Sequence, residues 1–149
     1  MSDRDIRDRY EHIDTHDHGD PAATVAPPLH EARVAIVTTA GLRPDGSGVW
    51  SDGQGFVALD GATRDLTLAH ASANFDRAGV AADLDVVYPV DRLAEAAAEG
   101  RIGSVASRHV AFMGAQLDHT LTTLRLDTGP AAAKLLIDDG VDVVLLTPV

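Results

Sequence analysis

The chain has 149 residues, of which 45% are hydrophobic and 23% charged, and this size and balance predict one soluble globular domain. Its net charge of −11 at pH 7 argues against a nucleic-acid partner, because phosphate backbones would repel it. No apolar run approaches the ~20 residues that span a bilayer, so no membrane partner is expected. The absence of cysteine excludes disulfides, thiolate metal sites and a cysteine nucleophile within these residues.

Residues 1–30 are predicted to form a flexible amino-terminal arm. The arm begins with charged residues and has no apolar stretch typical of a secretory signal, so we expect the protein in the cytoplasm. Its stretch EHIDTHDHGD alternates histidine with aspartate, at His12, Asp14, His16, Asp17, His18 and Asp20. Imidazole and carboxylate groups suit zinc or nickel, which makes the three histidines candidates for a metal site. A solvated polar arm is the favoured interpretation, because a metal site needs surrounding residues that fix its ligands.

The stretch ARVAIVTTAG predicts the first strand. Residues 34–38 are apolar or β-branched throughout, which is typical of a strand buried on both faces of a parallel sheet. The glycine-rich loop that follows, GLRPDGSGVWSDGQG, contains neither of the common phosphate-binding patterns, so nucleotide binding is not favoured. The loop still leaves the carboxyl end of a parallel strand, where α/β proteins bind their ligands. Residues 56–59 and 65–70 predict two further strands.

The middle of the chain is less regular. Residues 71–84 show no clear period, and residues 85–89 predict a short strand or extended segment. Asp83 and Asp85 are interpreted as turn and cap residues. Residues 108–114 predict a strand that ends in a glycine turn.

The stretch VDRLAEAAAEG predicts the clearest helix. Asp91 suits its first turn, and Gly100 suits the left-handed position that ends a helix. The expected apolar stripe consists of Leu93, Ala94 and Ala97.

A second helix and a strand form the last predicted unit. The helix covers residues 129–139, with Thr128 as its cap, Pro130 in its first turn and Gly140 at its end. Residues 141–146 predict a strand buried on both faces. A helix, a tight glycine turn and an apolar strand argue for an α/β fold in a single domain: a mostly parallel sheet with covering helices, layered as in flavodoxin and Rossmann folds.

Two histidines stand at predicted strand ends. His70 ends one strand and His109 begins another. A single histidine in such a position is more often a hydrogen-bonded structural residue than a catalyst. Both become candidates for a site if they converge with Thr38, Thr39 and Asp76 at one mouth of the fold.

Four stretches together resemble the selenoprotein B family. They are RVAIVTTAGL, DLTLAH, DVVYPVDRLAEAAAEGRIGSVASRHVAFMG and DDGVDVVLLTPV. The family comprises the catalytic subunits of glycine, sarcosine and betaine reductases and of D-proline reductase, and the D-proline reductase branch is the most similar. The resemblance runs from about Arg33 to Val149. The order and spacing of the four stretches make the joint signal specific.

The resemblance implies a reductase that acts on a small amine or amino acid. In the family, a selenocysteine or cysteine follows the strand and proline that LLTPV matches, and a second cysteine usually lies three residues further on. This nucleophile attacks the substrate carbon and expels an amine, or opens the proline ring. The resulting selenenyl sulfide or disulfide is then reduced by thiols.

The resemblance also assigns candidate site residues. Thr38, Thr39 and Gly41 are expected beneath the site, His70 and Asp76 as its polar contacts, and His109 and Gly114 as a further wall.

The sequence departs from the family at the nucleophile, because the chain ends after Val149, one position early. Selenocysteine is encoded by UGA, which is otherwise a stop codon. We therefore expect UGA after codon 149, selenocysteine in the full-length product and no other cofactor. Residues 31–149 would then form a reductase-like α/β domain that is incomplete at its carboxyl end and inactive by itself.

Two alternatives stay open. The chain is a redox-inactive binding or scaffold paralogue that associates with a partner reductase subunit, or a small metal-binding protein that uses the amino-terminal histidines. Missing downstream strands would expose a sheet edge, which invites pairing with another chain, so a homo-oligomer is expected.

Overall fold

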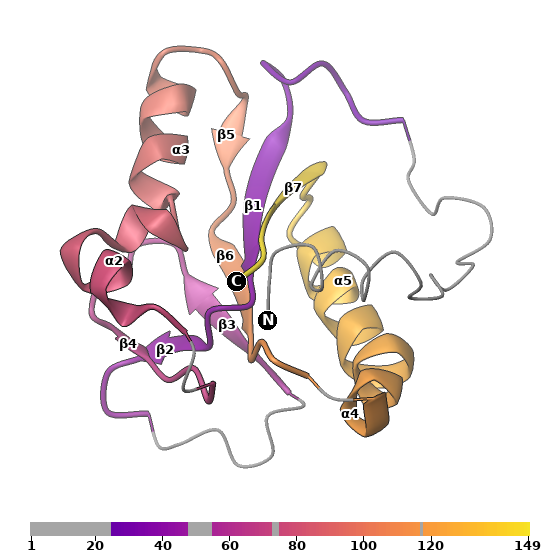
Figure 1. Ribbon diagram of the computed structural model, residues 1–149. Helices are drawn as coiled ribbons and strands as arrows, with labels where there is room; N and C mark the ends of the chain where they lie inside the picture. The colour runs from indigo at the N-terminus through magenta and orange to yellow at the C-terminus, as the bar shows by residue number, and fades with distance from the viewer. Residues whose placement is uncertain (1–24, 48–54, 73–74, 117) are drawn as a thin grey trace, which may run out of the picture.

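The computed structural model describes residues 25–47, 55–72, 75–116 and 118–149 (Figure 1). Its main sheet is built around β1 (Arg33–Thr38), which is parallel to β7 (Val143–Thr147) on one side. On the other side β1 is parallel to β5 (Ser104–Val105) and then to β6 (Arg108–Phe112). Strand β3 (Phe56–Asp60) is antiparallel to β6 and forms the far edge. The predicted α/β class with a mostly parallel sheet is confirmed.

Helices cover both faces of this sheet (Figure 1). One face carries α2 (Arg77–Ala82) and α3 (Val90–Ala98). The other face carries a continuous helical segment made of α4 (Asp118–Thr123), a π-helical turn (Leu124–Thr128) and α5 (Gly129–Asp138). Among the described residues, none of the helices has both the length and the apolar character needed to cross a bilayer.

The alternation of side chains along β1 builds both halves of the core. Ala35 and Val37 pack toward α5, whereas Ile36 packs with Val87 and Tyr88 on the opposite face. Successive side chains of a strand point to opposite faces, so an apolar run with helices on both sides is buried throughout. The prediction for residues 34–38 is therefore confirmed.

The pairing of β1 shifts by two residues between β5 and β6. Val34 pairs with Val105, but Val37 pairs with Val110. The β5–β6 segment therefore has two more residues than the part of β1 that it faces. This offset leaves the N–H group of Ile36 in β1 without a strand partner. The side chain of His109 accepts its hydrogen bond instead.

The predicted helix at residues 91–100 is confirmed as α3. Asp91 lies in its first turn, and Gly100 has a φ of 72°. The buried positions are Val90 and Ala96, whereas Ala94 is exposed, so the predicted apolar stripe is displaced around the helix.

Two short elements were missed in the middle of the chain. Helix α2 lies within the segment predicted as irregular, and a 3₁₀ turn (Leu84–Val86) overlaps the segment predicted as a short strand or extended. Each begins at an aspartate cap: Asp76 accepts from the N–H of Ala78, and Asp83 accepts from the N–H of Asp85. The elements are too short to show helical periodicity, so only their caps mark them in the sequence.

The helix α5 is confirmed, but Thr128 does not cap it. Thr128 has helical dihedral angles and makes no capping hydrogen bond, because the π-helical turn runs directly into α5. Gly140 has a φ of 69° and follows the end of the helix, as predicted.

The strand β7 is present as predicted, but it is not buried on both faces. Leu146 is 66% exposed, and Val144 and Leu145 are each 38% exposed. Among the described residues β7 pairs only with β1, so its outer edge and part of both faces lie at the surface. The same apolar sequence therefore forms an edge strand here.

A second, smaller sheet completes the fold. Strands β2 (Leu42–Pro44) and β4 (Leu66–Leu68) pair in antiparallel fashion. Strand β4 confirms the core of the strand predicted at residues 65–70, whereas β2 was predicted as loop. The leucines of both strands pack against the core on the α2 and α3 face, which brings the segment after β4 next to the carboxyl end of the main sheet.

Candidate active site

The carboxyl end of β7 is tied to the loop that follows β1. The carbonyl of Thr147 accepts hydrogen bonds from the N–H of Thr39 and the hydroxyl of Thr38, both at 3.3 Å. The hydroxyl of Thr39 accepts from the N–H of Val149 at 2.9 Å and donates to its carbonyl at 3.2 Å. These contacts fix the position of Val149 at the end of the parallel strands.

His70 lies beside this strand end and is held from several directions. Its Nδ1 accepts from the N–H of Ser72 at 3.2 Å, and its ring stacks on Phe75 with 4.4 Å between ring centroids. Nη2 of Arg77 donates to the main-chain carbonyl of His70 at 2.7 Å. The side chain is only 6% exposed, so its orientation is well defined.

The partners of His70 determine where its proton lies. A main-chain N–H only donates, so Nδ1 is the unprotonated nitrogen, and the neutral ring carries its proton on Nε2. Burial, and secondarily the charge of Arg77, lower the pKa of His70. Nε2 has no hydrogen-bond partner among the described residues. His70 therefore presents an unused donor at this site.

Gly114 allows these groups to come together. A Cβ atom at this position would lie 2.6 Å from Nε2 of His70, 2.8 Å from the carbonyl oxygen of Thr39 and 3.0 Å from that of Val149. The first two distances are shorter than real Cβ contacts, and the third is at the limit. The loop after β6 thus approaches the ends of β1 and β7 only because residue 114 is glycine.

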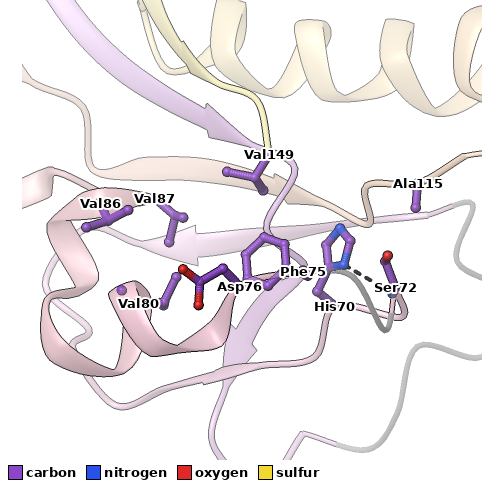
Figure 2. Close-up of a pocket in the computed structure, with 10 residues that line it drawn as sticks. His70, Ser72, Phe75, Asp76, Val80, Val86, Val87, Ala115 and Val149 are labelled. Carbon is purple, nitrogen blue, oxygen red and sulfur yellow. Dashed lines mark hydrogen bonds between the residues drawn. The ribbon is translucent and has the colours of Figure 1, made fainter. Parts of the chain in front are cut away.

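A cavity of about 500 Å³ opens beside His70 and Val149 (Figure 2). Figure 2 shows His70 and Asp76 on either side of Phe75, with Val149 at the end of its strand. The remaining wall is mostly apolar and includes Val80, Val86 and Val87. One carboxylate oxygen of Asp76 caps α2, so the carboxylate is fixed at the wall. A mostly apolar pocket with a few oriented polar groups is the usual form of a small-molecule site.

A second cavity of about 550 Å³ lies on the other side of the same strand end. It also touches Ala115 and Val149, and it reaches α4 and α5 through Leu121, Leu124 and Gly129. The end of β7 therefore stands between two cavities, one on each face of the sheet.

The structure brings most of the predicted site residues together. Thr39, His70, Asp76 and Gly114 surround the end of β7. Thr38 and Gly41 lie behind them: the Thr38 side chain is buried, and a Cβ at Gly41 would lie 3.2 Å from the main-chain nitrogen of His70. The candidate metal ligands His12, His16 and His18 lie outside the described residues.

His109 is separated from this group. Its Nδ1 accepts from the N–H of Ile36 at 3.0 Å, which is the group that the two-residue offset leaves without a strand partner. The ring is fully buried and meets Tyr88 edge-on, at 5.4 Å between ring centroids. Burial, and secondarily the charge of Arg64, lower the pKa of His109 to about 4. Its observed role is to complete the sheet.

Three further residues of the site were not predicted. Phe75 and Ser72 orient His70, and Ala115, with a φ of 54°, turns the chain after Gly114. Ser72 follows His70 by two residues, a spacing at which a side chain often hydrogen-bonds to the main chain. This pattern is too common to indicate a site.

Fold and geometry define an α/β protein with a candidate ligand site at the carboxyl ends of its parallel strands, where such sheets place their sites. The family of the glycine/sarcosine/betaine reductase selenoprotein B matches residues 7–149, so the chain belongs to this family. The match begins earlier than the resemblance near Arg33 indicated.

A relative in the D-proline reductase branch is also found. The D-proline reductase subunit gamma of Acetoanaerobium sticklandii is 30% identical over 123 residues, which cover 80% of this chain and 49% of the relative. The chain thus spans about half the length of the curated relative that it matches. No solved structure matches the chain.

Proposed function

We propose that this chain carries the substrate-binding side of a reductase subunit that cleaves a carbon–nitrogen bond in a small amine or amino acid. The observation that best supports this is the meeting of Thr39, His70, Gly114 and Val149 at the end of β7, beside a cavity. Membership of the selenoprotein B family supports reductive cleavage as the class of reaction.

In the proposed reaction, a selenolate or thiolate that follows the β7 and proline stretch attacks the substrate carbon. The carbon–nitrogen bond breaks, and its electron pair leaves with the nitrogen. A second thiol then attacks the selenium or sulfur, and the carbon takes the electron pair and a proton. The selenenyl sulfide or disulfide that forms is reduced by external thiols, which is consistent with a cytoplasmic location because thiols stay reduced there.

The first cavity suits a small substrate with a positive charge. Asp76 places a carboxylate in its wall, and Phe75, Val80 and Val87 offer apolar surface for a carbon skeleton. In this proposal Thr38 and Gly41 support the wall without touching the substrate.

The test uses the gene product purified from its own host, at the length that the host makes. Oxidation of dithiothreitol is followed with glycine, sarcosine, betaine or D-proline as the acceptor. We expect oxidation that depends on one of these compounds and falls at least tenfold in Asp76→Asn, because the substrate loses a charge partner. Asparagine also caps helices, so α2 is retained.

Asp127→Asn is the matched control, because Asp127 is exposed in the π-helical turn. Its activity is expected to equal that of the unchanged protein. If none of the four compounds is consumed by the native product, the proposed function is wrong.

A second function, binding to another copy of the chain, is favoured by the edge of β7. Leu146 and Ile137 are 66% and 71% exposed, and they border an apolar groove of about 340 Å³ between β7 and α5. An apolar edge strand is a template for strand pairing. We propose that two copies pair through β7.

Light scattering at micromolar concentration tests this pairing. We expect a dimer, a monomer for Leu146→Lys, and an unchanged dimer for Leu126→Lys, whose leucine is 69% exposed but lies in the π-helical turn. A monomeric unchanged chain contradicts the proposal. Assembly only with another protein of the host would indicate a partner reductase subunit instead.

A further inference from the structure

The donor of His70 is a buried polar group of this site whose partner the described residues do not supply. Nε2 is buried, carries the proton of the neutral ring and faces Gly114 next to the end of β7. A buried donor without an acceptor is costly, so such a group in a cavity wall indicates a partner that arrives with function.

We propose that the Nε2–H group of His70 donates a hydrogen bond to the nucleophile of the reductase site and stabilises its thiolate or selenolate form, while the imidazole itself stays neutral. This assignment rests on the proposed function. His70 is then a positioning and stabilising group for the nucleophile. It is neither a general base nor one half of an imidazolium ion pair.

The location of Nε2 favours the nucleophile over the substrate as its partner. Nε2 is buried and lies against Gly114, whose main chain also packs closely against Thr39 and Val149. In the proposed subunit, a nucleophile that follows Val149 is therefore better placed to accept from Nε2 than a free ligand in the cavity. An acceptor that belongs to the polypeptide is delivered to this position by the contacts between Thr39 and Val149.

The surroundings keep the ring neutral. Protonation of Nδ1 would place two donors against each other, because the N–H of Ser72 already points at this atom. The two charged groups on the side of α2 are Arg77, which holds the main chain of His70, and Asp76, which lines the same cavity. The positive charge of Arg77 disfavours protonation of the His70 ring, and it also favours an anion nearby.

The absence of cysteine makes a direct test straightforward. A Cys-Gly-Gly extension after Val149 introduces a single thiol and moves the terminal carboxylate away from it. The pKa of this thiol is measured from the pH dependence of its alkylation by iodoacetamide. We expect a value below the ordinary ~8.5 that rises by about one pH unit in His70→Leu, because the donor is lost.

His70→Gln is the conservative variant, since a glutamine amide places an N–H near the position of Nε2, and most of the lowered pKa is expected to return. If the thiol pKa is the same with histidine, glutamine and leucine at this position, the assignment is wrong. No substrate is present in this measurement, so its outcome is independent of whether the proposed reductase activity is found.

Nitrogen-15 NMR of the histidines in the same extended chain, with His70 otherwise unchanged, gives a second readout. We expect His70 to remain a neutral Nε2–H tautomer while the thiol ionises, with the Nε2–H proton shifting downfield in step. A doubly protonated ring beside the thiolate would overturn the assignment. So would a shift that occurs only when glycine or D-proline is added, because the acceptor would then be the substrate.

Gly114→Ala provides a matched perturbation. Its Cβ is expected to displace the His70 ring and raise the thiol pKa as His70→Leu does. Gly55→Ala makes the same chemical change where no atom of the described residues lies within 4 Å, and it should leave the thiol pKa unchanged. Equal effects of the two substitutions would contradict the proposed contact.

Discussion

Two histidines of this protein have the same local chemistry but different surroundings. In each, Nδ1 accepts a main-chain N–H, from Ile36 for His109 and from Ser72 for His70. In each, Nε2 therefore carries the proton, and it has no partner among the described residues. His109 is the second residue of β6, whereas His70 follows β4 and lies at the carboxyl end of the main sheet.

The difference shows that position in the sheet, rather than residue type, separates a structural group from a candidate site. His109 is sealed between the sheet and Tyr88, at the amino end of a parallel strand. His70 borders a cavity where three segments of the chain meet, and Gly114 keeps that approach open. Parallel sheets expose the loops at their carboxyl ends, and ligands bind there.

The largest effects on stability are expected when each of the two histidine side chains is removed. His109→Ala should lower the free energy of unfolding by about 3 kcal/mol or more, because it leaves a cavity and an unpaired Ile36 N–H in the core. His70→Ala should cost only about 1–2 kcal/mol, since its ring lines a cavity and accepts only from the N–H of Ser72 in a nearby loop. Urea denaturation measures both values, and equal losses would contradict the division into core and site.

Acidification should reveal the buried state of His109 without any substitution. The pKa of His109 is about 4 in the folded protein, against an ordinary value of 6.5. Between these values the unfolded chain binds more protons, so stability is complete above about pH 6.5 and falls as the pH drops to 4, by at most about 3 kcal/mol. The measurement is urea denaturation across this pH range.

His109→Asn should flatten this pH dependence, because an amide oxygen still accepts the Ile36 N–H but does not titrate. His70→Gln should retain most of it. If the pH dependence of stability disappeared with His70→Gln instead, His70 would be its source and the prediction for His109 would be wrong.

A smaller loss is expected at the close approach beside His70. Gly114→Ala should destabilise the protein by about 1–3 kcal/mol, because its methyl group meets two main-chain oxygens that cannot move freely. Gly55→Ala should change stability by less than about 0.5 kcal/mol. Thermal unfolding compares the two, and a neutral Gly114→Ala would show that the strand ends are not tightly packed.

The smallest effect is expected where β7 is tied down. Thr39→Val removes the hydroxyl that both accepts from and donates to Val149, at a cost of about 1 kcal/mol. Amide exchange should rise at Val149 and remain unchanged in β1. Thr122→Val in the exposed face of α4 is the control, and it should affect neither.

Long periodic segments of the fold were predictable, and short or context-dependent ones were not. The apolar run of β1 and the glycine-terminated helices α3 and α5 carry clear signals, which the structure confirms. Helix α2 has only six residues, too few to show a period. The burial of β7 was predicted wrongly because an apolar strand has the same sequence at an edge as in a centre, and only the number of its neighbours distinguishes the two.

The candidate site shows the same limit. The parallel topology and the family pattern together predict that residues after β1, β4 and β6 meet, and His70, Thr39 and Gly114 do so. The same reasoning placed His109 with them. Its separation follows from its place near the amino end of β6, away from the carboxyl ends where the other residues meet. The two-residue offset between β5 and β6 gives its ring a partner in the sheet, and this offset is a property of strand pairing that the local sequence does not indicate.

The pairing of β1 with β7 joins residues 109 positions apart. Closing so long a loop costs conformational entropy, so this pair is expected to form after the local helices. Every contact that positions Val149 depends on it. The cavity beside His70 would thus be assembled late in folding, and a chain in which β7 has not yet paired would have its helices but no site.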